Sequence, residues 1–239
     1  MTKRLTGFSL LYFIGQNPVF MSMDRKKAEA SKKNLQNADL KNTDLQEADL
    51  SDGVLIEACL ENSNLSEVDF CGADLSGASL LNARLHRTVL YRCRAKEADF
   101  SKVVLTQANL VESNFSSAKF NNSNLKESNI EGANLTDTQF INANLSEVNL
   151  TGVFLANANL SGADLTNSEL IAADLAGCDF SEANLENAYL NHADLSGANL
   201  KSARNLTRDQ VETAFINKET LLPDSIPLRW ISNTEYEFQ

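Results

Sequence analysis

The chain has 239 residues, 43% of them hydrophobic and only 7% aromatic, so one large domain or two small ones with an aliphatic core are expected. A formal net charge of −11 argues against direct binding to nucleic acids or to anionic membranes, and favours either a basic partner or simply solubility. The four cysteines form no CxxC pair and no cluster with histidine, which predicts no zinc site, no disulfide framework and no cofactor, and favours a reducing, cytoplasmic location.

The N-terminal segment, residues 1–33, precedes the regular part of the chain. Two basic residues and a moderately apolar stretch over 5–14 resemble a signal peptide, but no small-residue cleavage site follows. Secretion, with residues 1–20 as the signal, is therefore the minority alternative to a cytoplasmic location. Residues 24–33 predict a short basic helix with Asp24 as its N-cap, which would cover the first repeats.

From Leu35 to Leu200 every fifth residue is large and apolar. All 34 of these sites, called position i here, hold Leu, Phe or Ile, except Ala95. A small residue is common at i−2, most often alanine, and Asp or Asn is commonest at i−1. A strict period of five fits neither the spacing of three and four residues of a helix nor the alternation of a strand.

A coil with four sides accounts for this period. The side chains at i−2 and i would point inward, those at i−1, i+1 and i+2 would face outward, and the chain would turn a corner in every pentapeptide. Stacked coils would then hydrogen-bond edge to edge, as strands do in a parallel sheet. The sequence predicts an all-β, quadrilateral parallel β-helix of about 8.5 coils over residues 34–204, with short helical caps at both ends.

The unit A(D/N)LXX, as in Ala38-Asp39-Leu40 and Ala133-Asn134-Leu135, resembles the pentapeptide-repeat family over about residues 33–204. The resemblance implies a right-handed coil. Some members of this family resemble B-DNA in shape and charge and bind DNA gyrase or topoisomerase IV, whereas others have regulatory or effector roles. The repeat runs from 35 to 200 without inserted loops, which is closer to the mycobacterial type of gyrase inhibitor than to the quinolone-resistance members.

Charge divides the coil into three zones. Residues 35–83 carry ten acidic residues and one basic residue, 84–126 carry eight basic and three acidic, and 127–200 carry eleven acidic residues and no Lys or Arg. The last zone, the acidic half, therefore has about three negative charges per coil of ~4.8 Å, close to the one charge per ~1.7 Å of B-DNA. It is either a solvated surface that resists aggregation or a DNA-like docking surface.

Side chains twenty residues apart would stack, so the acidic half can be compared side by side. The side built on Leu125, Leu145, Leu165 and Leu185, called the Leu125 face, is the richest in acid. The predicted partner contacts on this face are Glu127, Glu147, Asp164 and Glu186.

The middle zone contains a basic belt, defined as Arg84, Arg87, Arg92, Arg94 and Lys96. These cations either pair with the acidic zones on both sides, each pair stabilising the fold little, or contact an anion or a protein partner. The belt surrounds Ala95, which leaves the core underfilled unless Cys93 at i−2 compensates in part.

Residues 205–239 follow the last repeat. A capping-box pattern from Thr207 to Gln210 predicts a helix to about Asn217, with Val211 and Phe215 on one face, and the apolar tail beyond it shows no regular pattern. This region either caps the last coil or forms a homodimer interface, as the resemblance to gyrase-binding members implies. The residues predicted for either role are Val211, Phe215, Leu221, Leu222 and Trp230.

No catalytic pattern accompanies the repeat. The sequence holds no P-loop, no GxGxxG and no supported Ser/His/Asp arrangement, and His86 and His192 would lie about five coils apart. We therefore expect a non-catalytic protein-binding rod without a metal, in its most concrete form a DNA mimic that modulates a type II topoisomerase and protects it from quinolone-like poisons. The alternatives are a structural or signalling scaffold that binds through the basic belt or the end caps, and a secreted effector.

Overall fold

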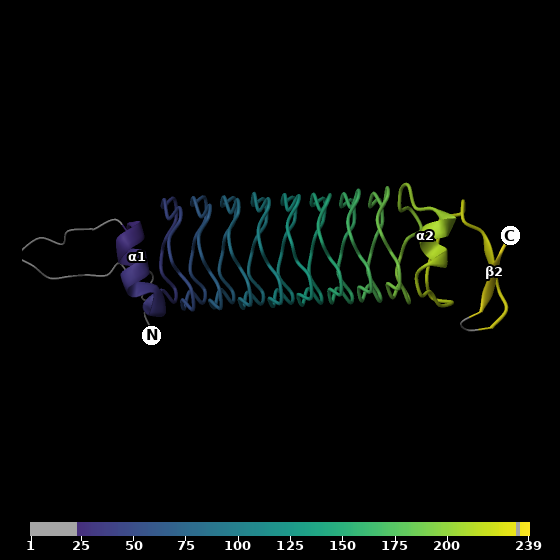
Figure 1. The fold of residues 1–239 in the computed structure, drawn as a ribbon, viewed down its shortest axis with the longest axis horizontal. Coiled ribbons are helices and arrows are strands. Elements are labelled where there is room, and N and C mark those ends of the chain that lie inside the picture. The colour runs from purple at the N-terminus through teal and green to yellow at the C-terminus, as the bar shows by residue number, and fades with distance from the viewer. Residues whose placement is uncertain (1–22, 233–234) are drawn as a thin grey trace, which may run out of the picture.

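The computed structural model describes residues 23–232 and 235–239, and the candidate signal segment 1–20 lies outside them. A long regular coil fills most of the length, with α1 (Arg25–Ser31) and a 3₁₀ turn, η1 (Lys32–Asn34), at its N-terminal end (Figure 1). At the other end follow α2 (Arg208–Glu212) and the strands β1 (Leu228–Trp230) and β2 (Tyr236–Phe238). None of the described helices is long and apolar enough to cross a membrane.

Parallel pairing between i−1 residues twenty apart builds the coil. The pairs run without a gap from Asp39 with Cys59 to Asn184 with Arg204, so four pentapeptides complete one turn. The amide of Leu40 donates to the carbonyl of Cys59 at 2.7 Å, and the amide of Cys59 donates back to Ala38 at 2.9 Å. Each side of the coil is thus one short strand of a parallel ladder.

Each corner is a tight turn with a left-handed residue at its third position. In the first corner the amide of Ala38 donates to the carbonyl of Leu35 at 3.0 Å, and Asn37 has a φ of 57°. A positive φ recurs at every i+2 site from Asn37 to Gly197. This explains why Asn and Gly are frequent at i+2, because these residues adopt the left-handed region at the lowest cost.

The Asp and Asn side chains at i−1 bond to the following corner. The Asp69 carboxylate accepts the backbone N–H of Cys71 at 2.8 Å, and the Asn159 amide oxygen accepts that of Ser161 at 2.9 Å. The expectation that i−1 simply faces solvent is therefore incomplete, since most of these side chains are half-buried and close an Asx turn. The preference for Asp and Asn at i−1 follows from this bond.

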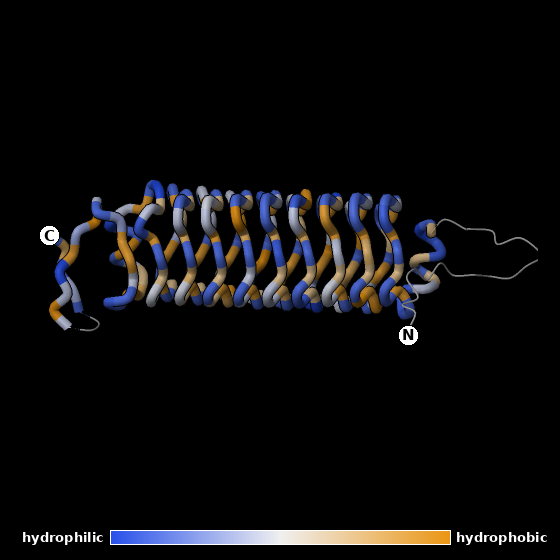
Figure 2. Tube along the Cα trace, turned by 180° about the vertical axis from the view of Figure 1, so that it is seen from behind, coloured by the Kyte–Doolittle hydropathy of each residue, from blue (hydrophilic) through white to orange (hydrophobic). Residues whose placement is uncertain are grey.

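The core is a column of position-i side chains from Leu35 to Leu200, each at most 1% exposed. Hydrophobic residues recur in register from coil to coil along the tube (Figure 2). The expected aliphatic core is in fact mixed, because the ring of Phe120 stacks between those of Phe100 and Phe140 at centroid distances of 4.9 and 5.0 Å. Phe115, one coil beyond Ala95, packs edge-on against Phe100 at 5.5 Å, so aromatic rings fill space next to the small residue.

The N-terminal helix covers the first coil. Asp24 is its N-cap, as predicted, and accepts the backbone N–H of Lys27 at 3.0 Å. Ala28 is fully buried, and the carbonyl of Lys32 accepts the amide of Val54 at 2.7 Å. The cap therefore satisfies a backbone group that the edge of the coil would otherwise expose.

The prediction of a helix from Thr207 to Asn217 is wrong in its second half. The capping box of Thr207 and Gln210 is present, but α2 ends at Glu212, and Phe215 pairs in parallel with Asp194. The segment from Ala214 to Ile216 repeats the small–outward–large pattern, with both of these residues buried, so it extends the coil instead of the helix. Val211 is buried whereas Phe215 is 60% exposed, so the two do not share a face.

The C-terminal tail is more regular than predicted. Strands β1 and β2 pair antiparallel, with Trp230 opposite Tyr236 and their rings 5.3 Å apart. The guanidinium of Arg208 lies 4.4 Å from the centroid of the Phe238 ring, which joins the hairpin to α2. The cross-strand aromatic pair explains why this tail forms strands without a repeat.

Candidate protein-binding surface

The structure brings the four predicted acidic contacts onto one side of the coil but gives them different surroundings. Glu127 and Glu147 are exposed at i+2 corners, one coil apart. Between them lies Lys126, whose ammonium is 3.6 Å from a carboxylate oxygen of Glu127 and 3.2 Å from one of Glu147. The side chain of Gln107 also donates to Glu127 at 2.8 Å, and this bond is the main cause that lowers the pKa of that carboxyl group. This part of the Leu125 face is therefore partly neutralised.

Asp164 and Glu186 differ in how far their carboxylates are committed to the fold. Asp164 is half-buried, and one carboxylate oxygen accepts the backbone N–H and the hydroxyl of Thr166 and the amide of Asn184. Glu186 is exposed and forms no ion pair with the described residues. Glu186 is thus the most available of the four carboxylates.

The basic belt divides into a paired and an unpaired part. Arg92 contacts Glu112 at 2.6 Å and Arg94 contacts Asp74 at 3.1 Å, each one coil away, while Lys96 lies 3.3 Å from Glu97. Arg87 donates to the neutral side chain of Gln107 at 3.1 Å, and Arg84 is exposed without an ion pair to any described residue. The cations available for an anionic partner are therefore Arg84 and Arg87.

The five residues predicted for a cap or dimer interface also separate. Val211 is buried, and Leu222 and Trp230 pack partly buried against the core. Phe215 and Leu221 occupy outward i−1 sites of the last, irregular coil and are 60% and 50% exposed. The inward residues close the core, while the homodimer stays a prediction for the two outward ones.

Two exposed aromatic residues were missed by sequence reasoning. Phe154 and Tyr189 stand at i−1, where Asp or Asn is usual, and each is 54% exposed. Each also lines a surface pocket, of about 390 Å³ for Phe154 and about 450 Å³ for Tyr189. The departure from the Asp/Asn rule at these two sites is the sequence signal that would have found them.

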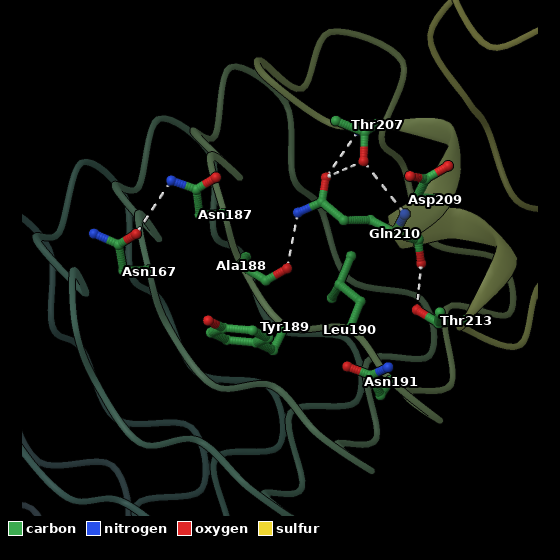
Figure 3. A pocket seen from close by; sticks show the side chains of 10 residues that line it. All are labelled: Asn167, Asn187, Ala188, Tyr189, Leu190, Asn191, Thr207, Asp209, Gln210 and Thr213. Carbon is green, nitrogen blue, oxygen red and sulfur yellow. Dashed lines mark hydrogen bonds between the residues drawn. The ribbon is translucent and has the colours of Figure 1, made fainter.

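The pocket at Tyr189 forms where α2 leaves the last regular coil (Figure 3). Its wall is rich in amides, including Asn167, Asn187 and Asn191. The side chain of Gln210 closes one end, donating to the carbonyl of Ala188 at 2.8 Å. This hollow is open to solvent, and no group of three metal-ligating side chains occurs in it or elsewhere in the described chain.

The buried titratable groups offer no reactive centre. Cys93 and Cys178 point into the core, where loss of solvation raises the pKa of each thiol to about 12. Such thiols are poor nucleophiles at neutral pH, since the thiolate is the reactive form.

Comparison with known proteins agrees with this repeat. The family model for pentapeptide repeats matches eight copies over residues 34–204, and no curated protein sequence matches the chain. HetL, a pentapeptide repeat protein involved in heterocyst differentiation regulation in Nostoc sp. strain PCC 7120, is 29% identical, with 83% of this chain and 95% of that chain covered and a TM-score of 0.32.

Two other solved structures are similar. A pentapeptide repeat protein from the thylakoid lumen of Arabidopsis thaliana is 36% identical over 41% of this chain and 69% of its own, with a TM-score of 0.41. QnrB1, a plasmid-mediated fluoroquinolone resistance protein, is 18% identical over 76% of this chain and 92% of its own, with a TM-score of 0.47. The match to the repeat model covers most of the chain, and the chain therefore belongs to the pentapeptide-repeat family, whose members form right-handed β-helices.

Proposed function

We propose that this protein is a non-catalytic protein-binding rod whose acidic half docks on the basic, DNA-binding surface of a type II topoisomerase. Pentapeptide-repeat proteins are generally binding or structural proteins. The observation that carries the proposal is the acidic half itself, in which residues 127–200 hold eleven carboxylates and no Lys or Arg. A partner that normally holds DNA presents the complementary charge.

The structure supports this proposal through the distribution of charge. Carboxylates at i−1, i+1 and i+2 project from all four sides of the coil, and beyond Glu147 no described residue up to Thr207 forms an ion pair. About three charges per coil of ~4.8 Å give nearly the linear charge density of B-DNA, one charge per ~1.7 Å. Unpaired carboxylates at this density repel one another along the coil, and this repulsion lowers the stability of the fold.

A supercoiling assay with purified gyrase or topoisomerase IV tests the proposal. We expect micromolar rod to reduce supercoiling and quinolone-stabilised cleavage, with an effect that weakens as salt rises. The double reversal Glu127→Lys/Glu147→Lys should abolish the effect, because it replaces two negative charges of the acidic half by positive ones.

The matched control is Glu57→Lys/Glu67→Lys, which changes the net charge by the same amount at exposed i+2 corners of the first acidic zone. This control should retain most of the activity. The proposal is wrong if wild-type rod leaves both supercoiling and cleavage unchanged, or if the two double variants lose the same activity.

A scaffold role is the second candidate, and Arg84 and Arg87 favour it because neither forms an ion pair with a described acidic side chain. In that case Arg84→Glu/Arg87→Glu, and not the reversal in the acidic half, should abolish binding to the partner. Arg92→Glu/Arg94→Glu is the control, since those two arginines already pair with Glu112 and Asp74.

A further inference from the structure

One side of the coil carries a column of two aspartates that is flanked by two phenylalanines. Phe154 pairs with Asp174, Asp174 with Asp194, and Asp194 with Phe215, each pair one coil apart. These four i−1 side chains, called the Phe–Asp ladder here, thus form a column in which two carboxylates lie between two rings. The rings are 54% and 60% exposed.

The fold does not require a phenylalanine at residue 154 or at residue 215. At i−1 an Asp or Asn accepts the N–H of the next corner, as Asp174 does for Ala176 at 3.2 Å, and a phenyl ring cannot accept this bond. The rings also lie outside the core, so about half of their apolar surface stays in water. A partner that covered the two rings would remove this apolar surface from water, which is favourable.

The surface beside Phe154 is open. The corner next to it carries Gly132 and Gly152, and a Cβ built on either glycine meets no atom within 4 Å. Corners elsewhere accept larger residues at the same backbone angle, such as Asn142 with a φ of 55°. Gly132 lines a surface hollow of about 390 Å³ together with Phe154 and Asp174, and packing does not exclude a side chain at this glycine.

The carboxylates of the Phe–Asp ladder are available to a cationic partner. One oxygen of Asp174 and one of Asp194 accept the backbone N–H two residues on, at 3.2 and 2.9 Å. Neither carboxylate forms an ion pair with a described residue, and the acidic half contains no Lys or Arg that could reach them. Each therefore keeps its charge and a second oxygen for a donor from outside.

We infer that the Phe–Asp ladder binds an extended, arginine-bearing segment of a protein partner. A guanidinium group combines a flat face that stacks on a phenyl ring with N–H donors that fit a carboxylate, which is the combination that the ladder offers. The rings lie about 14 Å apart over three coil steps, and an extended peptide covers that length in about four residues. The inference rests on the proposed function only in requiring a basic partner, and a topoisomerase is not needed for its test.

Fluorescence anisotropy of labelled octa-arginine, titrated with the full chain at low salt, provides the test. Phe154→Asn/Phe215→Asn removes two exposed cation–π contacts and leaves the net charge unchanged. We therefore expect this double variant to bind octa-arginine about tenfold more weakly. The fold should be kept, since Asn is the usual residue at i−1. Tyr189→Asn, an equally exposed ring on a different side, is the control and should bind as the wild type does.

A second pair of variants separates a local site from diffuse attraction. Asp174→Asn/Asp194→Asn and Asp99→Asn/Asp179→Asn remove the same charge, and Asn keeps the turn-closing oxygen in all four positions. We expect only the first pair to weaken octa-arginine binding by more than about fivefold, and octa-lysine to bind the wild type less tightly than octa-arginine. Filling the hollow with Gly132→Asn should also weaken binding.

Equal losses for the two aspartate pairs, or unchanged binding in Phe154→Asn/Phe215→Asn, would overturn the ladder as a binding site. Because the probe is a peptide, a rod that binds it through the ladder but leaves topoisomerases unaffected would contradict the proposed function alone. A rod that inhibits topoisomerase equally well with and without the two rings, and binds the peptide without preference, would contradict the ladder alone.

Discussion

The ammonium of Lys126 lies 3.2 Å from a carboxylate oxygen of Glu147, which belongs to the next coil. The same ammonium is 3.6 Å from Glu127, so one cation at the border of the acidic half is shared by two of its carboxylates. Glu147 in turn raises the pKa of Lys126 as the largest contributor. Lys126 therefore reduces the negative potential where the Leu125 face begins.

Replacing this cation should affect binding and stability in opposite directions. Lys126→Gln removes a shared surface ion pair and leaves Glu127 and Glu147 to repel each other, which should lower the free energy of unfolding slightly. It should also strengthen inhibition of the topoisomerase, because the docking surface becomes more negative. Lys102→Gln is the control, because Lys102 is exposed at a corner and forms no ion pair with any described residue. Weaker inhibition by Lys126→Gln would count against the acidic half as the contact.

The turn-closing bond at i−1 can be tested at Asp164. Asp164→Ala removes the acceptor for the N–H and hydroxyl of Thr166 and should lower the free energy of unfolding by about 1 kcal/mol. Asp164→Asn keeps the acceptor and should unfold at nearly the wild-type urea concentration. Equal urea midpoints for the two variants would show that the bond contributes nothing.

The stacked ring of Phe120 should be among the most sensitive core sites. Phe120→Ala opens a cavity between Phe100 and Phe140 and should cost about 3–5 kcal/mol in the free energy of unfolding. Phe154→Ala, which removes a ring of the same size from the surface, should change it by about 0.5 kcal/mol or less. Thermal and urea denaturation of both variants measure the free energy of unfolding. Similar losses in the two variants would contradict the placement of Phe120 in the core and of Phe154 on the surface.

Gln210 has two roles that substitutions separate. Its side-chain oxygen accepts the N–H of Thr207 in the capping box, and its amide donates to the carbonyls of Leu185 and Ala188, both at 2.8 Å. Gln210→Glu keeps the first role and loses the second, so we expect a loss of about 1–3 kcal/mol. Amide hydrogen exchange should quicken over residues 185–200. Wild-type protection in Gln210→Glu would mean that these bonds do not hold the last coil.

The architecture could be predicted because one requirement, an inward large residue every fifth position, dominates it. The Asp24 N-cap and the Thr207 capping box were also predictable, since each depends on a few neighbouring residues. The left-handed conformation of the corner residue could not be predicted, although it explains why Asn and Gly are frequent at i+2. Periodicity shows which side chains point inward, but it does not give the φ of a turn residue.

Features that depend on contacts between coils could not be predicted in the same way. The charge zones were divided between Lys126 and Glu127, yet these two side chains lie 3.6 Å apart. Lys126 also contacts Glu147 in the next coil, and Glu127 accepts a hydrogen bond from Gln107 in the preceding coil. Phe215 was placed on a helix because its spacing from Val211 is helical. The pairing with Asp194 across the last coil is stronger than this local preference, as tertiary context often overrides propensity.

The most direct test of the central claim is a competition measurement. Gyrase or topoisomerase IV is immobilised, rod is bound, and duplex DNA is added at increasing concentration while bound rod is measured by surface plasmon resonance. Docking of the acidic half on the DNA-binding surface predicts that DNA displaces the rod completely, and that Glu127→Lys/Glu147→Lys binds at least about tenfold more weakly than Glu57→Lys/Glu67→Lys. Rod that fails to bind, or that stays bound at saturating DNA, would contradict the claim.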